Sequence, residues 1–276
     1  MTIGADGPVP AMRPAVQETY GPADLSAEPG FAGGFINFGY WRGIELGLPL
    51  GEPERVRSQQ EMYRRVLAAA GPLGERRVVE VGCGLGMGCA LALDEYRPAA
   101  VTGMDIHPDQ LARARAAHGD RLAAAPDRLR FVRGAAERMP FGDGEFDAVV
   151  SVEAAQHFPD LAAFAAEAAR VLAPGGRLAL ASFFADPAEG RAAELAALLP
   201  SFADGLDIAR PVAALTAPLA VAGLTDIRVE PIGADVWPGL DAWLSRLLPP
   251  GAWPRNFLPA YRRGLLDYHV ITARHP

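Results

Sequence analysis

The glycine-rich stretch between Val78 and Ala90, VVEVGCGLGMGCA, most constrains how this chain can fold. A short apolar run comes first, glycines then occupy every second position from Gly82 to Gly88, and a further apolar run follows. A buried strand, a glycine turn and a helix N-terminus in this order present backbone N–H groups to a ligand. The stretch therefore predicts a ligand-binding loop at the start of a β–α unit.

Beyond this loop, apolar runs alternate with helix patterns. Pro108 is placed to start one helix and Asp160 to cap another. This alternation is typical of an α/β fold in which helices cover both faces of a mostly parallel sheet. Strands are predicted at residues 76–82, 99–106, 129–134, 146–154, 177–185, 224–232 and 268–275.

Charge and cysteine content narrow the class of protein. The 276 residues carry a net charge of −7, which argues against general nucleic-acid binding. Two cysteines, Cys83 and Cys89, provide no disulfide framework and no zinc pattern, so a reducing, cytoplasmic setting is expected. We expect no signal peptide, no membrane span and no metal site, because apolar segments are short and acids do not cluster.

The glycine loop does not fit the dinucleotide fingerprint G-x-G-x-x-G/A, because its last place falls on Met87 or on Cys89. It does fit E-x-G-x-G-x-G, which begins at Glu80 and includes Gly82 and Gly84. In this respect it resembles motif I of the class I S-adenosylmethionine-dependent methyltransferases. The resemblance implies a Rossmann-like sheet of seven strands, of which the last is antiparallel. It also implies S-adenosylmethionine as cofactor and S-adenosylhomocysteine as product.

Two further stretches carry the same resemblance. Asp105 ends the second predicted strand, 21 residues after Gly84, where the family's carboxylate accepts the ribose hydroxyls. The stretch RGAAERMPFGDGEFDAVV is similar to the family's motif before the fourth strand, but Ala135 stands where a carboxylate usually bonds the adenine amino group. The backbone of Ala135 and Ala136 is then expected to read the adenine edge, and what replaces the carboxylate is left open.

Within the family, the stretches NFGYW and VEAAQHFPDL resemble small-molecule methyltransferases of natural-product tailoring, such as the phthiotriol-type O-methyltransferases. The expected reaction is methyl transfer to a hydroxyl of a lipid or polyketide. The alternatives are methylation of nitrogen or carbon, or a non-methylating protein that keeps the cofactor. A nicotinamide-dependent oxidoreductase and a nucleic-acid methyltransferase are both disfavoured. The expected partner is a small molecule, and a homodimer stays open.

Residues 1–30 are rich in Pro, Gly and Ala and are expected to form a flexible segment in the absence of ligand. The remaining residues, 31–276, are expected to form one methyltransferase domain. Within that domain we expect an N-terminal lid and helix (31–72), a cofactor-binding core (73–186), and substrate-covering elements with the last two strands (187–276).

His157 follows the fourth predicted strand and is the candidate general base, although a structural role is an equal alternative. Glu153 is the second catalytic candidate, expected to orient His157 or to face the substrate. The aromatic pair Tyr40 and Trp41 is expected to close over the cofactor as a lid. The expected cofactor-binding set is Tyr40, Trp41, Glu80, Gly82, Cys83, Gly84, Asp105, Ile106, Ala135, Ala136, Glu137 and Val152.

Overall fold

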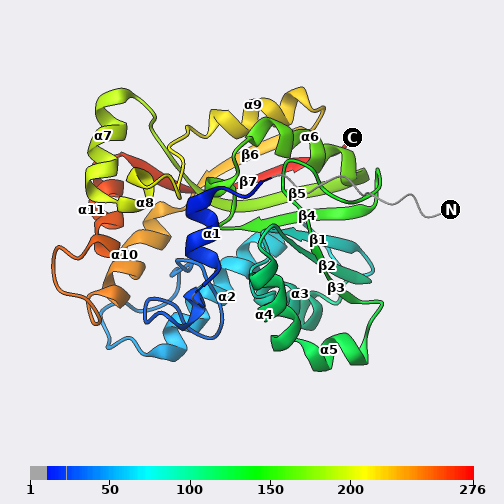
Figure 1. Cartoon of the computed structure of the whole chain (residues 1–276), viewed down its shortest axis with the longest axis horizontal. Helices are drawn as coiled ribbons and strands as arrows, with labels where there is room; N and C mark the ends of the chain where they lie inside the picture. Colours follow the sequence, from blue (N-terminus) through cyan, green and yellow to red (C-terminus); the bar gives the residue numbers. More distant parts are fainter. Residues whose placement is uncertain (1–10, 23) are drawn as a thin grey trace.

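A computed structural model describes residues 11–22 and 24–276 of the chain. Across these residues, seven strands form one sheet in the order β3-β2-β1-β4-β5-β7-β6 (Figure 1). β7 runs antiparallel to β5 and β6, while β1 to β5 pair in parallel. The predicted Rossmann-like sheet with an antiparallel last strand is therefore confirmed.

All seven predicted strands are present, and β5 begins five residues earlier than predicted. Their bounds are β1 (Arg77–Val81), β2 (Ala100–Asp105), β3 (Leu129–Arg133), β4 (Phe146–Val152), β5 (Leu172–Ala185), β6 (Thr225–Pro231) and β7 (Leu266–Arg274). The 3-10 turns are η1 (Leu25–Ala27), η2 (Ala155–His157) and η3 (Trp253–Asn256). The α-helices are α1 (Pro14–Tyr20), α2 (Glu52–Ala69), α3 (Met87–Tyr96), α4 (Pro108–Ala117), α5 (Gly119–Ala124), α6 (Leu161–Val171), α7 (Glu189–Leu198), α8 (Pro200–Ala203), α9 (Ala213–Val221), α10 (Gly233–Leu244) and α11 (Phe257–Arg262).

Side-chain alternation along the strands builds two hydrophobic cores, one on each face of the sheet. Val78 belongs to a cluster that also contains residues of α2, α3 and α4 and of the C-terminal helices α10 and α11. Its neighbour Val79 points to the other face and packs with α6 and α9. Both valines are fully buried, which explains why β1 reads as a continuous apolar run rather than an alternating one.

The N-terminal segment differs from the prediction of a flexible region over residues 1–30. Residues 1–10 lie outside the described residues, but α1 is a helix that lies across the loops that follow the strands (Figure 1). Val16 is the only residue of α1 that is buried. Polar contacts hold the helix instead: the Arg113 guanidinium donates to the carbonyls of Tyr20 and Gly21, and Arg13 donates to the carbonyl of Leu206. Because no apolar periodicity marks such a helix, the sequence pattern did not reveal it.

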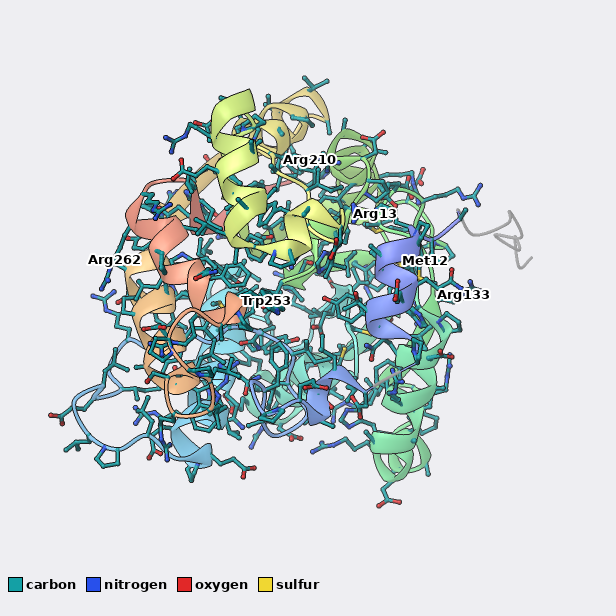
Figure 2. The ribbon with its side chains drawn as sticks, turned by 60° about the vertical axis from the view of Figure 1, so that its left-hand side comes forward. Met12, Arg13, Arg133, Arg210, Trp253 and Arg262 are labelled. Carbon is teal, nitrogen blue, oxygen red and sulfur yellow. The ribbon has the colours of Figure 1, made fainter. Side chains whose placement is uncertain are left out.

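The C-terminal half completes the sheet and fills the core. Trp237 on α10 is fully buried and stacks on Phe257 at 5.2 Å between ring centroids, and both rings contact Phe38. Arg262 at the end of α11 lies on the opposite side of the view from Arg13 in Figure 2. Among the helices of the described residues, none combines the length and the apolar character needed to cross a membrane.

Candidate active site

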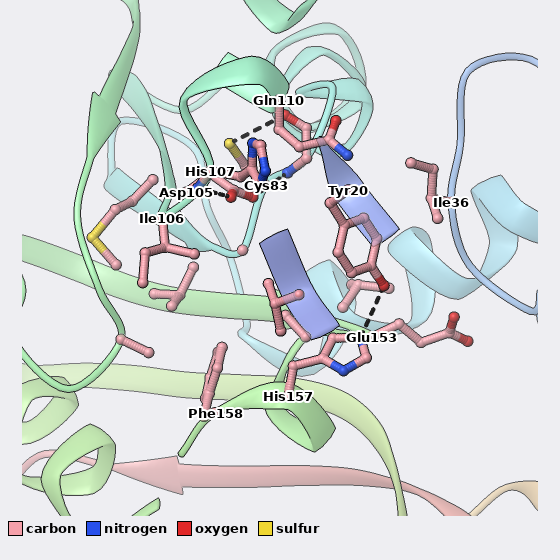
Figure 3. Close-up of a pocket in the computed structure, with 18 of the residues that line it drawn as sticks. Tyr20, Ile36, Cys83, Asp105, Ile106, His107, Gln110, Glu153, His157 and Phe158 are labelled. Atoms are coloured by element: carbon pink, nitrogen blue, oxygen red, sulfur yellow. Dashed lines mark hydrogen bonds between the residues drawn. The ribbon is translucent and has the colours of Figure 1, made fainter. Parts of the chain in front are cut away.

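A cavity opens at the carboxyl ends of β1, β2 and β4, where ligands of parallel sheets bind (Figure 3). The empty space at this site is about 1080 Å³ when the solvent at its open mouth is included. The loops after these strands form its floor, and the segment from Ala11 to Tyr20 forms its cover. Among the described residues, no residue beyond Pro159 lines it. The expected role of residues 187–276 as a substrate cover stays a prediction.

The glycine loop after β1 can adopt its shape only with glycine at two positions. Gly82 has a φ of +76°, and a Cβ there would lie 2.4 Å from the side chain of Ala154. Gly86 has a φ of +73°, and a Cβ there would lie 2.5 Å from the Phe131 ring. A side chain at either position would strain the turn and push into its neighbour. The predicted loop is thus formed, and Gly82, Cys83 and Gly84 all line the cavity.

Asp105 ends β2 at the wall of the cavity (Figure 3). Its Oδ2 accepts the Gly84 N–H at 2.9 Å, and its Oδ1 accepts the His107 N–H at 2.8 Å. Burial raises the pKa of the Asp105 carboxyl, and these backbone donors oppose that rise. Each carboxylate oxygen keeps a second lone pair, so Asp105 can still accept two hydroxyl groups of a ribose.

Glu80 lies behind the glycine loop and not in the cavity wall. Its Oε2 accepts the Cys89 thiol at 3.0 Å, whereas its Oε1 is buried without a hydrogen-bond partner. Burial raises the pKa of Glu80 to about 7. A buried carboxylate oxygen without a donor is costly. Glu80, an expected cofactor-binding residue, is therefore suited to interact with a cationic group, directly or through water.

The loop after β3 turns sharply between Gly134 and Arg138, where Ala135 and Arg138 form an isolated bridge. Ala136 and Glu137 line the cavity, as does Ile106 after β2. Ala135 is buried outside the wall. The expected contact of the Ala135 backbone with the adenine edge stays a prediction, whereas Ala136, its neighbour in the same expectation, does line the cavity.

His157 lies at the end of η2, and its ring is held from both sides. Nδ1 is 3.0 Å from the Leu206 carbonyl oxygen and 3.3 Å from Oδ1 of Asp207. Because a carbonyl oxygen only accepts, Nδ1 carries the proton and Nε2 is the unprotonated nitrogen. Nε2 accepts the Tyr20 hydroxyl at 2.9 Å (Figure 3) and lies 3.2 Å from the amide nitrogen of Gln156.

Electrostatics favour the neutral form of this imidazole. Burial lowers the pKa of His157, and the nearby Arg13 guanidinium lowers it further, while Asp207 opposes both. The unprotonated Nε2 accepts the hydroxyl of Tyr20, which also lines the cavity. It therefore has the geometry of a general base.

Glu153, the second catalytic candidate, also lines the cavity, but its carboxylate is hydrogen-bonded to neighbouring residues of the protein. Oε1 accepts the Phe38 N–H at 2.7 Å and the Tyr268 hydroxyl at 2.8 Å. Burial raises the pKa of Glu153 to about 8. The expectation that Glu153 orients His157 is wrong, because Leu206 and Asp207 hold that ring.

Tyr40 and Trp41 do not form a cofactor lid. Trp41 is 3% exposed, its ring packs on Gly239 of α10, and its Nε1 donates to the Phe38 carbonyl at 3.0 Å. The Tyr40 hydroxyl donates to Asp235 at 3.3 Å. Neither residue lines the cavity, because both rings complete the core between α2 and α10. The preceding residues Gly34, Phe35 and Ile36 form this part of the wall instead.

The sequence analysis missed four side chains of the site. Arg13 and Tyr20 stand in a Pro- and Gly-rich segment without periodicity, and Asp207 stands in a loop, so no pattern marks them. Gln110 did carry a signal. It is a polar residue on the buried face of α4, beside Leu111 and Ala114, where an apolar residue is the norm.

A sheet of this topology with a glycine loop after β1 and a carboxylate at the end of β2 defines a binding site for an adenosyl cofactor. Residues 79–180 match the family model described as "Methyltransferase domain". Erythromycin 3''-O-methyltransferase of Saccharopolyspora erythraea is 32% identical over 88% of this chain and 84% of its own length. The chain belongs to the class I S-adenosylmethionine-dependent methyltransferases, whose cofactor is S-adenosylmethionine.

Two further comparisons agree with this membership. A fatty-acid O-methyltransferase of Mycolicibacterium smegmatis is 39% identical over 51% of this chain, and the match spans about half (50%) of that relative's length. The structure of geranyl diphosphate C-methyltransferase from Streptomyces coelicolor A3(2) superposes with a TM-score of 0.76, over 96% of this chain and 100% of the other. At 18% identity, that superposition shows the shared fold alone.

Proposed function

We propose that this protein methylates a hydroxyl group of a lipid or polyketide natural product, with His157 as the general base. The observation that carries the proposal is the unprotonated Nε2 of His157 at the cavity wall, fixed by the Leu206 carbonyl on the other side of the ring. The Tyr20 hydroxyl, 2.9 Å from Nε2, marks where an acceptor hydroxyl would have to lie. The similarity to an erythromycin O-methyltransferase supports an acceptor of this kind.

The residues of the glycine loop and of the neighbouring strand ends would hold the cofactor. Two glycines without room for a Cβ and the unpartnered Oε1 of Glu80 are the features that fit it. When bound, S-adenosylmethionine supplies a methyl group on a positively charged sulfur, and the demethylated cofactor is released as S-adenosylhomocysteine. The residues proposed for cofactor binding are Glu80, Gly82, Cys83, Gly84, Asp105, Ile106, Ala136, Glu137 and Val152.

The side chains around His157 would accept and release the proton of the acceptor hydroxyl. An acceptor hydroxyl that replaces the Tyr20 hydroxyl donates to Nε2, and Nε2 takes its proton as the new O–CH₃ bond forms. Asp207 beside Nδ1 stabilises the resulting imidazolium, and the imidazolium then returns the proton to solvent. In this proposal α1 covers the cavity while the methyl group is transferred, and the proton leaves to solvent when the cover opens.

A fatty-acid carboxylate is the second candidate acceptor. The similarity to a fatty-acid O-methyltransferase favours it, and so does Arg13, whose buried Nε at the cavity wall has no partner. A carboxylate is already deprotonated at neutral pH and needs no base. The two acceptors therefore differ in their dependence on His157.

Mass spectrometry of reactions with S-adenosylmethionine distinguishes them. Purified protein is offered fatty alcohols, macrolide alcohols and fatty acids, and the methylated products are identified. Methyl ethers whose formation falls about 10²- to 10⁴-fold in His157→Gln support the hydroxyl proposal. Methyl esters formed equally well by His157→Gln would establish the carboxylate reaction instead. His275→Gln, near the C-terminus, is the matched control, and the substitution at position 157 should leave S-adenosylhomocysteine affinity unchanged.

A further inference from the structure

The buried side chain of Gln156 lies directly beside the nitrogen of His157 that is proposed to take the proton. Gln156 belongs to the η2 turn after β4 and is 7% exposed. Its amide nitrogen is 2.9 Å from the Glu153 carbonyl oxygen and 3.2 Å from Nε2 of His157. Its amide oxygen accepts the hydroxyl of Ser182 on β5 at 2.7 Å. Both ends of this amide therefore have partners, and one of those partners is the base.

The two ends of the amide can be told apart by these partners. The Glu153 carbonyl oxygen only accepts hydrogen bonds, so the amide atom that faces it is the nitrogen. At the other end, the fully buried hydroxyl of Ser182 donates to the amide oxygen. The amide nitrogen carries two hydrogens, of which the Glu153 carbonyl takes one. The second hydrogen is the donor available to Nε2 of His157.

We propose that Gln156 is a positioning residue that donates its second amide hydrogen to Nε2 of His157 and thereby keeps this nitrogen without a proton. The two sides of the ring then agree. The Leu206 carbonyl can only accept from Nδ1, and the Gln156 nitrogen can only donate to Nε2. The catalytic consequence rests on the proposed role of His157 as general base, whereas the state of the ring can be measured without an acceptor.

Gln156 differs from Tyr20, the other donor at Nε2, in what holds it. Tyr20 belongs to α1, which covers the cavity through polar contacts. The amide of Gln156 is held by β5 and by the backbone directly after β4, so it stays in place when an acceptor hydroxyl replaces the Tyr20 hydroxyl. At 3.2 Å its contact with Nε2 is longer than that of Tyr20 at 2.9 Å. The nitrogen therefore remains accessible to the acceptor.

The same contact acts on the imidazolium that forms during the reaction. Once Nε2 has taken the proton of the acceptor hydroxyl, its new N–H faces an amide nitrogen that accepts no hydrogen bond. A donor opposite a donor destabilises the charged ring relative to the neutral one. Gln156 therefore lowers the pKa of His157 and favours release of the proton to solvent, which restores the base.

The charges around the ring do not by themselves keep it neutral. Burial lowers the pKa of His157, and one guanidinium lowers it further, but two carboxylates raise it. Burial also raises the pKa of the Tyr20 hydroxyl well above its usual range, so Tyr20 remains a donor. Gln156 is an uncharged donor that adds to the effect of burial. The charged and titratable groups that face the ring are Arg13 and Tyr20 of α1, Asp105 at the end of β2 and Asp207 in the loop after α8.

Nuclear magnetic resonance of protein with isotope-labelled histidine tests the proposal, with and without S-adenosylhomocysteine. The ring-nitrogen shifts report which nitrogen carries the proton, a pH titration gives the pKa, and His157→Gln identifies the signal. Wild-type His157 should carry its proton on Nδ1. Gln156→Glu replaces the donor with an acceptor and should raise the pKa of His157 by about 1 or more. Gln156→Met removes the donor at similar volume and should raise this pKa by about 0.5.

Methyl-transfer assays provide the second readout. In Gln156→Glu the acid limb of the kcat/KM profile should move to higher pH by as much as the pKa of His157 rises, because the base works only when it is unprotonated. Gln17→Glu adds the same charge at an exposed position of α1 and is the matched control, which should change neither the pKa nor the profile. A thermal melt verifies folding. If Gln156→Glu does not fold, the wild-type spectrum and Gln156→Met still decide the question.

Two results would overturn the proposal. A wild-type ring with its proton on Nε2 would show that the Gln156 amide does not donate there. An unchanged pKa of His157 in folded Gln156→Glu and Gln156→Met would show that the amide only supports η2. A pKa that rises as expected while the methylation rates and their pH profile stay the same has a different meaning. It upholds the contact between Gln156 and His157 and contradicts the proposed role of His157 as general base.

Discussion

The cavity has two walls that are built in different ways. The cofactor wall, made by Gly82, Gly84 and Asp105, consists of short loops that leave neighbouring strands of one sheet. The acceptor wall consists of Tyr20, His157 and the Asp207 carboxylate behind it, which come from three distant segments of the chain. Strand register holds the first wall, whereas side-chain hydrogen bonds hold the second.

This difference indicates which wall of the cavity is more stable and which can rearrange more easily. The backbone N–H of Gly84 and the carboxylate of Asp105 are fixed by adjacent strands that are almost fully buried. By contrast, α1 has one buried residue and covers the cavity through polar contacts. We infer that the cofactor wall is rigid, and that α1 opens at a lower free-energy cost to admit the ligands.

The largest effect on binding is expected at the cofactor wall. Asp105→Ala removes two acceptor oxygens from the ribose and leaves the Gly84 and His107 N–H groups without their partner. Loss of charge-assisted hydrogen bonds on this scale should weaken S-adenosylhomocysteine binding about 100-fold by isothermal titration. Asp109→Asn, at an exposed carboxylate on the first turn of α4, is the control and should bind normally. Normal binding by Asp105→Ala would show that the ribose does not lie at the end of β2.

A smaller effect is expected behind the acceptor wall, where Asp207 acts as a positioning residue. Asp207→Asn should lower kcat about tenfold, because the imidazolium of His157 loses its nearby negative charge. Of the charged groups around His157, Asp207 and Asp105 raise its pKa, and Arg13 lowers it. Removing the Asp207 charge therefore lowers the pKa of His157, and the acid limb of the kcat/KM profile should move to lower pH.

The matched control for this prediction is Asp204→Asn, an exposed carboxylate three residues away on the same loop. It should leave both the rate and the pH profile unchanged. A fall in kcat without any movement of the acid limb would mean that Asp207 only supports the loop, whose Asp207 N–H donates to the Ser201 carbonyl at 2.9 Å.

The two walls also differ in how far the sequence predicts them. The glycine loop and Asp105 follow from local patterns, because a turn that forbids a Cβ and a strand-end carboxylate are both determined within a few residues. The place of His157 beside the cavity was also predicted, since it lies only five residues after the end of β4. Tyr20 and Asp207 meet His157 across 137 and 50 positions of the chain, and no local pattern encodes contacts between single side chains at that separation.

Trp41 illustrates the opposite error. An aromatic residue before the first core strand has the chemistry of a cofactor lid, but it also has the volume of a core residue. The packing of α10 decides between these roles. Gly239 leaves room for the Trp41 ring and thereby draws it into the core. That glycine lies almost 200 residues away, so the sequence around Trp41 contains no sign of the outcome.

The smallest effect is expected at the contact between the cover and the base. In the proposed mechanism, the Tyr20 hydroxyl occupies the place of the acceptor hydroxyl on Nε2 of His157. Tyr20→Phe removes this competing hydrogen bond, which is worth about 1 kcal/mol, so the KM for the acceptor should fall by up to about fivefold at unchanged kcat. Tyr261→Phe, on α11 outside the cavity wall, is the control.

Steady-state kinetics with the acceptor found by mass spectrometry decides the role of Tyr20. A lower KM with an unchanged kcat means that the Tyr20 hydroxyl and the acceptor hydroxyl compete for Nε2 of His157, as expected from the geometry of the acceptor wall. A strongly reduced kcat would instead place Tyr20 in the proton path between the acceptor and His157. In that case the closed position of α1 would be the catalytic one, and the acceptor wall would be as finely fixed as the cofactor wall.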